Sequence, residues 1–180
     1  GKATGKGMLS KGHHVTFVDI DEKTLNYLES EGYQTLLFQN ISLEETDIIF
    51  VSVCTPTVDG HIVLDHLLSA ISRIGKALGT LTEESSQKYR VVVIRSTIPP
   101  GTTENLIIPL LEKNSQKRVR QDFGVCVNPE YLREKTAEKD FAHPWIVIIG
   151  ESDPKAVKIL EKLYMPFGCP IQRVSTIKVV

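Results

Sequence analysis

The sequence predicts an α/β fold built on a doubly wound, mainly parallel sheet. Two observations lead to this prediction: short apolar runs recur along the chain, and segments with helical periodicity separate them. Each run has four to six residues, most of them β-branched, which is typical of strands buried on both faces. Strands and helices that alternate in this way form βαβ units. The runs are residues 15–18, 48–53, 91–94, 123–127 and 146–149.

The segments between the runs have the spacing of amphipathic helices. Apolar residues at intervals of three and four predict a helix over residues 64–78, with Asp65 near its start and Gly79 at its end. A second helix is expected after Asp153 and Pro154, because aspartate caps helix N-termini and proline suits the first turn. The basic run 117–120 precedes a predicted strand, and we expect it to be a solvated loop.

Composition excludes several classes of protein. A length of 180 residues corresponds to about one domain. The 21 Lys and Arg residues balance 22 Asp and Glu residues, which argues against a polybasic binder of nucleic acids or membranes. No apolar run approaches the roughly 20 residues of a membrane span. Cys54, Cys126 and Cys169 are odd in number and widely spaced, so we expect reduced, buried thiols in a cytoplasmic protein. The five histidines show no metal-ligand spacing, and no metal is expected.

The chain opens with a glycine-rich, helix-like segment, residues 1–11, that no predicted strand precedes. A P-loop is excluded, because only three residues separate Gly1 from Gly5 and because Gly7 follows Lys6. Two interpretations remain open. The segment is a flexible leader, or Gly1 is the last glycine of a dinucleotide-binding fingerprint whose strand and first two glycines lie upstream.

The fingerprint makes a prediction about Asp19. In such motifs an acidic residue ends the second strand about 20 residues after the motif begins. With Gly1 as the sixth position, Asp19 follows the first position by 23 residues and ends the 15–18 run. A carboxylate there accepts hydrogen bonds from the adenosine ribose and repels a 2′-phosphate, which favours NAD over NADP. The spacing alone fits equally well a strand-end aspartate that caps the helix beginning near Asp21.

Three polar motifs follow three of the predicted strands. A Thr-Pro-Thr turn occupies residues 55–57, Arg-Ser-Thr-Ile-Pro-Pro-Gly-Thr-Thr occupies 95–103, and Asn-Pro-Glu-Tyr-Leu-Arg-Glu occupies 128–134. Together with residues 12–21 and 137–150, they resemble the UDP-glucose/GDP-mannose dehydrogenase family over essentially the whole chain. The second and third motifs are specific in this order and spacing, whereas the first alone is weak.

The resemblance implies a fold and an activity. The expected fold is a Rossmann-like NAD-binding domain over residues 1–180 that lacks its first strand, with the central helix and the C-terminal sugar-nucleotide domain absent. Family members oxidise the 6-hydroxymethyl group of a nucleotide sugar to a carboxylate in two NAD-dependent steps. UDP-glucose is the expected substrate, a UDP-sugar is the expected partner, and a homo-oligomer is expected for the full-length enzyme.

The resemblance also assigns roles to individual residues. Asp19 would hold the adenosine ribose, Lys23 would lie beside the adenosine end, and Thr55 would contact the cofactor where its strand ends. Thr97 would lie near the nicotinamide and help to position water. The implied cofactor contacts are Gly1, Asp19, Lys23, Thr55, Thr97 and Glu134.

A loop along the sugar nucleotide is implied for the third motif. Its substrate contacts would be Glu130, Tyr131, Leu132, Arg133 and Glu134, with Thr97 and Glu134 as the catalytic residues. Glu134 would serve as acid and base during thioester hydrolysis. Two positions depart from the family pattern: Lys135 replaces a small residue and Trp145 replaces an arginine, which puts local substrate contacts in doubt.

The family's nucleophilic cysteine belongs to a glycine-rich segment that does not occur in these 180 residues. We therefore expect the chain by itself to be inactive. Two other functions stay open: a non-catalytic dinucleotide-binding or interaction module, and a dehydrogenase of the β-hydroxyacid type, against which the 128–134 motif argues. At individual sites, Thr55 could belong to a simple turn, and Glu134 could be a surface charge paired with Arg133 or Lys135.

Overall fold

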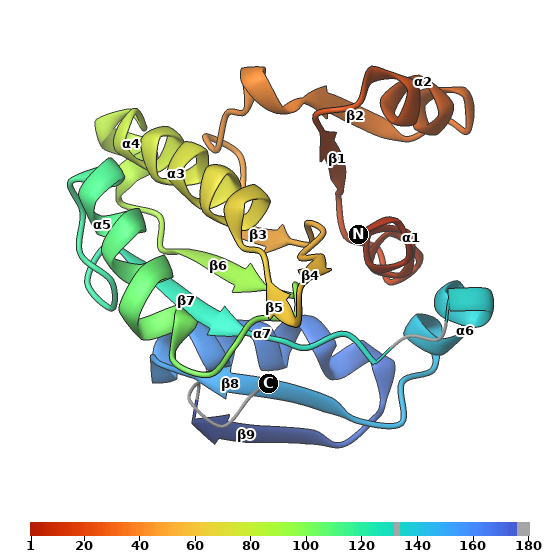
Figure 1. Ribbon diagram of the computed structural model, residues 1–180. Coiled ribbons are helices and arrows are strands. Elements are labelled where there is room, and N and C mark those ends of the chain that lie inside the picture. Colours follow the sequence, from red (N-terminus) through yellow and green to blue (C-terminus); the bar gives the residue numbers. More distant parts are fainter. Residues whose placement is uncertain (132–133, 176–180) are drawn as a thin grey trace. The chain divides into compact units, whose positions relative to one another are not determined.

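The structure, a computed structural model, describes residues 1–131 and 134–175 (Figure 1). The chain divides into two compact units. The large unit comprises Leu43–Tyr131 and Trp145–Val180, and the small unit comprises Gly1–Ser42 and Leu132–Pro144. Within the described ranges, no helix combines the length and the apolar character that crossing a membrane requires.

A five-stranded sheet forms the centre of the large unit. Its strand order is β3-β6-β7-β8-β9, and every neighbouring pair is parallel except β7 and β8. Both β6 and β7 are buried along their whole length, as the continuous apolar runs predicted. The predicted α/β fold with a mainly parallel sheet is therefore confirmed. The strands are β3 (Ile48–Val51), β6 (Arg90–Ile94), β7 (Phe123–Val127), β8 (Val147–Glu151) and β9 (Ile171–Ser175).

Helices cover both faces of this sheet. Figure 1 shows α3 (Asp65–Gly79) and α5 (Ile108–Ser115) on one face and α7 (Pro154–Tyr164) on the other. The helices α3 and α5 approach closely at Gly75, where an added Cβ would lie 2.8 Å from the Cβ of Asn114. A π-helix, η2 (Thr103–Ile107), leads directly into α5. The unit also contains α4 (Glu83–Ser86) and the 3-10 helix η4 (Met165–Phe167).

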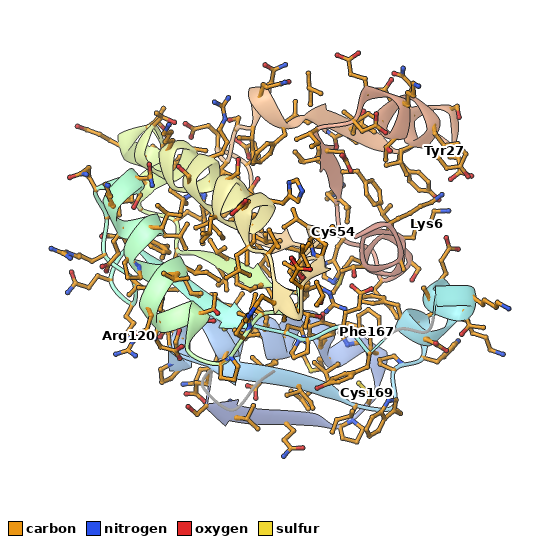
Figure 2. All side chains as sticks on the ribbon, in the orientation of Figure 1. Lys6, Tyr27, Cys54, Arg120, Phe167 and Cys169 are labelled. Atoms are coloured by element: carbon orange, nitrogen blue, oxygen red, sulfur yellow. The ribbon has the colours of Figure 1, made fainter. Side chains whose placement is uncertain are left out.

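A small antiparallel hairpin follows β3. It pairs β4 (Thr57–Val58) with β5 (His61–Ile62) through a two-residue turn. Asp59 and Gly60 both have positive φ angles, 50° and 78°, the combination that tight hairpin turns require. Cys54 is exposed where the chain leaves β3 toward this hairpin (Figure 2), so the prediction of a buried thiol is wrong there.

The small unit packs short elements around α1 (Lys2–Ser10). Within the described residues, its parallel strands β1 (Thr16–Asp19) and β2 (Gln34–Leu37) pair only with each other. Glycines inside α1 permit close packing, because a Cβ at Gly5 would meet the ring of Phe17 at 2.3 Å and one at Gly7 would meet the ring of Phe141 at 2.0 Å. The remaining elements are α2 (Glu22–Ser30), η1 (Phe38–Asn40), η3 (Glu134–Thr136) and α6 (Ala137–Ala142).

A polar cluster joins the helices of the small unit. Glu31 forms ion pairs with Lys2 and Lys6 at 3.4 and 3.3 Å, and it accepts a hydrogen bond from the hydroxyl of Tyr27. Lys6 also pairs with Glu138 at 3.2 Å. Lys6 and Tyr27 are labelled in Figure 2. Because these charges satisfy one another within the unit, we assign the cluster a structural role.

Candidate functional site

Polar residues gather in the large unit at the carboxyl ends of β6 and β7. The two strands are parallel and in register, with Ile94 beside Val127, so the segments that follow them emerge at the same edge of the sheet. There they line an open pocket of about 180 Å³. Ligands of open α/β sheets bind beyond this edge. The lining residues are Arg95, Ser96, Thr97, Ile98, Val127, Pro129, Glu130 and Tyr131.

Hydrogen bonds fix the first of these segments against β3. The buried Ser96 hydroxyl donates to the carbonyl of Val53 at 2.7 Å and accepts from the Val53 N–H at 3.0 Å. The Thr55 hydroxyl donates to the carbonyl of Thr97 at 2.9 Å. The Thr-Pro-Thr and Ser-Thr motifs are therefore in direct contact, and the exposed Thr97 side chain is held on a fixed backbone at the pocket.

A buried polar network lies behind the pocket lining and begins at Arg95. The Arg95 guanidinium donates through Nη1 to Oδ1 of Asn128 at 2.5 Å and to the hydroxyl of Tyr164 at 3.2 Å. Tyr164 donates to the same Asn128 oxygen at 2.5 Å, and Nδ2 of Asn128 donates to the carbonyl of Ile148 at 2.8 Å. Burial raises the pKa of Tyr164 to about 12, so its hydroxyl stays protonated and available as a donor.

The network reaches the pocket through an ion pair. Nε of Arg95 lies 3.5 Å from Oε2 of Glu130, and the two side chains are 4% and 33% exposed. Sequence analysis placed Arg95 and Asn128 inside the specific motifs but gave them no role, and it missed Tyr164. Buried arginine, asparagine and tyrosine beside strand ends are the signal that could have drawn attention to them.

In the small unit, the structure separates two roles that the spacing left open. The N-cap of α2 is Asp21, whose carboxylate accepts from the N–H groups of Lys23 and Thr24 at 3.3 and 3.1 Å. The hydrogen bond from the Thr24 side chain lowers the pKa of Asp21. Asp19 is therefore not the cap. Its Oδ1 accepts from the N–H of Asp21 at 3.0 Å, and Oδ2 has no hydrogen-bond partner within the described residues.

The N-terminus of α1 suits an anion. Gly1 is the N-cap and offers no side chain to the first N–H groups of the helix. The Thr4 hydroxyl, in the first turn, is buried and has no hydrogen-bond partner among the described residues. A phosphate oxygen would satisfy donors of this kind. The small unit thus offers N–H donors at the start of α1 and a carboxylate acceptor at Asp19.

The positions of the other predicted site residues say less about their roles. Lys23 is exposed in the first turn of α2, and Tyr131 is 49% exposed. The backbone of Glu134 begins η3 in the small unit. Leu132 and Arg133 lie outside the described residues. Nowhere in residues 1–131 and 134–175 do three His, Cys, Asp or Glu side chains converge as a metal site requires.

A mainly parallel sheet with polar motifs at its carboxyl edge, and a strand-end carboxylate beyond the first helix, defines the class of dinucleotide-binding α/β domains. The chain belongs to the UDP-glucose/GDP-mannose dehydrogenase family, and residues 33–168 match the family's NAD binding domain. This match confirms both the family resemblance and NAD as the cofactor of the domain.

Individual relatives carry two different names. The chain is 33% identical to a GDP-mannose 6-dehydrogenase of Pseudomonas putida over 92% of this chain and 42% of that protein. It is also 33% identical to the UDP-glucose 6-dehydrogenase YwqF of Bacillus subtilis over 95% of this chain and 41% of that protein. The chain thus spans about two fifths of the length of these relatives.

A solved structure resembles the fold of this chain over nearly its whole length. A crystal structure of a ternary complex of GDP-mannose dehydrogenase from Pseudomonas aeruginosa superposes with a TM-score of 0.86 and 30% identity. The match covers 97% of this chain and 44% of that one.

Proposed function

We propose that the chain is the NAD-binding portion of a nucleotide-sugar 6-dehydrogenase, which oxidises the 6-hydroxymethyl group of the sugar to a carboxylate in two steps. The observation that supports this best is the convergence of Thr97 and Glu130 on one pocket beyond the carboxyl ends of β6 and β7. NAD supplies the hydride acceptor when it is bound. A hydroxyl and a carboxylate there can hold a water molecule within hydrogen-bond reach of a reacting carbonyl carbon.

The proposed cofactor contacts include residues of the small unit and residues of the large unit. In the small unit, Gly1 and the first turn of α1 take the pyrophosphate, Asp19 takes the adenosine ribose, and Lys23 lies at the adenosine end. In the large unit, Thr55 and Thr97 are proposed to contact the cofactor. Asp19 is supported by its open Oδ2, and Thr55 by its hydrogen bond to the Thr97 carbonyl.

The proposed substrate contacts come from the third motif. Glu130 and Tyr131 line the pocket, which supports their assignment to the sugar nucleotide. Leu132 and Arg133 are proposed on the family pattern alone. Glu134 likewise keeps its proposed role as acid and base, and as a cofactor contact, on the family pattern.

Two nucleotide sugars are candidates for the substrate. UDP-glucose is the substrate that the sequence motifs suggested, and the name of the B. subtilis relative supports it. GDP-mannose is favoured by the P. putida relative, which is 33% identical, and by relatives from other pseudomonads at 34–35% identity. Initial rates of NADH formation with both compounds, measured on the longest form of the protein that its gene encodes, would decide between them. If the protein oxidises neither compound, that result contradicts the proposed activity.

Asp19 provides a test of the cofactor site. We expect Asp19→Ala to raise the Kd for NAD about 10- to 100-fold, because charge-assisted hydrogen bonds to the ribose are lost. Isothermal titration calorimetry would measure this change. The matched control is Asp21→Ala, which removes the cap of α2 and costs about 1 kcal/mol of stability without affecting the ribose site. An unchanged Kd in Asp19→Ala would remove Asp19 from the cofactor site.

A further inference from the structure

Arg95 is a buried cation at the edge of the pocket. It directly follows β6, and its side chain is only 4% exposed. A buried charge is costly unless an opposite charge and hydrogen bonds compensate it. A carboxylate that compensates Arg95 is that of Glu130, which lines the pocket and is itself one-third exposed. The pairing therefore links the buried interior of the unit to a group that a ligand in the pocket can reach.

The guanidinium does not depend on the pocket for its own position. Asn128 and Tyr164 both bind its Nη1 nitrogen, and Asn128 is anchored in turn to the carbonyl of Ile148 in β8. These partners come from the end of β7, from β8 and from the last turn of α7, all regular elements of the buried framework. These partners thus set the orientation of the Arg95 guanidinium, and its Nε faces Glu130.

We infer that Arg95, braced by Asn128 and Tyr164, is a positioning residue that holds the Glu130 carboxylate in its working orientation in the pocket lined by Thr97. The inference rests on the proposed function, in which this pocket holds the reacting group. A planar fork can bind several partners in fixed directions, whereas a lysine ammonium acts as a point charge. In this role Arg95 acts on the reaction through Glu130.

The first test replaces the cation in the longest form of the protein that its gene encodes. We expect Arg95→Met to lower kcat about 100-fold, the loss that a misplacement near 1 Å can cause, while KM and the Kd for NAD stay within about threefold. Arg95→Lys keeps the charge without the fork, so it should recover part of kcat. A merely structural role would instead lower the amount of folded protein and leave kcat per folded molecule unchanged, which would overturn the inference.

Two further variants sharpen this test. Arg173→Met is the matched control, because Arg173 forms the more exposed arginine–glutamate pair with Glu161, and its kcat should stay within about twofold of the wild type. Tyr164→Phe removes only the bracing hydroxyl from a ring that remains packed. We expect it to fold and to lower kcat about tenfold, since one hydrogen bond to a charged group is lost. An undiminished kcat in Tyr164→Phe would overturn the proposed brace.

A double-mutant cycle identifies the route of the effect. If Arg95 acts through Glu130, then adding Arg95→Met to Glu130→Gln should change kcat by less than about twofold. A second loss of about 100-fold in that background would overturn the inference.

The outcome remains decidable if the wild type oxidises no nucleotide sugar, which would defeat the proposed function alone. Crystal structures of the wild type and of Arg95→Met would then show whether the Glu130 carboxylate turns away once the cation is removed. A carboxylate in the same orientation in both structures would overturn the inference. A turned carboxylate would support it.

Discussion

Two arginines flank β6, and they illustrate how the same residue serves two purposes. Arg90 begins the strand and Arg95 follows its end, and both are buried. Arg90 satisfies all five of its N–H groups with oxygens of the protein. The acceptors are the carbonyls of Leu43, Glu44, Ser85 and Lys88 and the hydroxyl of Ser85. Arg95 instead directs its Nε toward a carboxylate at the pocket.

Arg90 supplies a prediction about stability. Arg90→Met leaves several buried carbonyls without donors, at a cost of about 1–3 kcal/mol for each unsatisfied group, so we expect a loss of at least about 3 kcal/mol. Urea denaturation followed by circular dichroism would measure it. The Kd for NAD, measured on the fraction that remains folded, should not change. A loss below about 1 kcal/mol would mean that water replaces the guanidinium at this site.

At the residue scale, sequence analysis found the residues that stand in motifs and missed those that meet only in space. Thr97 and Glu130 were identified because each belongs to a motif directly after an apolar run. Tyr164 was not, because 69 residues separate it from Arg95 and nothing in the amphipathic pattern of α7 marks the last turn. The separation of Asp19 from the helix cap likewise needed hydrogen-bond geometry that spacing cannot supply.

Among the elements, the contact between β7 and α7 depends on a residue without a side chain. Gly124 lies in β7, and an added Cβ there would be 2.5 Å from the Cβ of Ala156 in α7. It would also lie 3.1 Å from Oδ2 of Asp153 and from the hydroxyl of Tyr89. Asp153 caps α7 and accepts a hydrogen bond from Tyr89, so the same point anchors the start of the helix.

This contact predicts the effect of a single methyl group. We expect Gly124→Ala to destabilise the protein by about 1–3 kcal/mol, because the start of α7 must move away from the sheet. Thermal unfolding by calorimetry would measure the loss. Adding Ala156→Gly removes the nearest atom and should restore part of the stability, despite the cost of about 1 kcal/mol for a helical glycine. A double variant less stable than either single variant would refute this explanation.

The elements that sequence analysis located are those with strong local signals. The run 123–127 coincides with β7, and the helix predicted between Asp65 and Gly79 coincides with α3. Asp153 and Pro154 start α7 as cap and first residue. The short strands β2 and β9 were missed because each is largely exposed or half-buried and shows no continuous apolar run. The antiparallel direction of β8 was also unpredicted, since periodicity does not encode strand direction.

At the scale of the whole molecule, the two units differ in how much they bury. In the large unit, every residue of β6 and β7 is buried. In the small unit, β1 has one buried residue, Phe17, and β2 has none. A two-stranded sheet has marginal stability without a packed face. The small unit therefore depends on helix packing and on the ion pairs around Glu31 for its stability.

This difference predicts two levels of hydrogen exchange. The amides of β6 and β7 should exchange only on global unfolding, whereas those of β1 and β2 should exchange through local opening and much faster. NAD at 100 times its Kd stabilises the binding-competent state by about 2.7 kcal/mol, so the amides of β1 and the first turns of α1 should slow by up to about 100-fold. Exchange mass spectrometry with and without NAD would measure both effects. If NAD protected only the large unit, the ribose and pyrophosphate contacts proposed for Asp19 and α1 would be wrong.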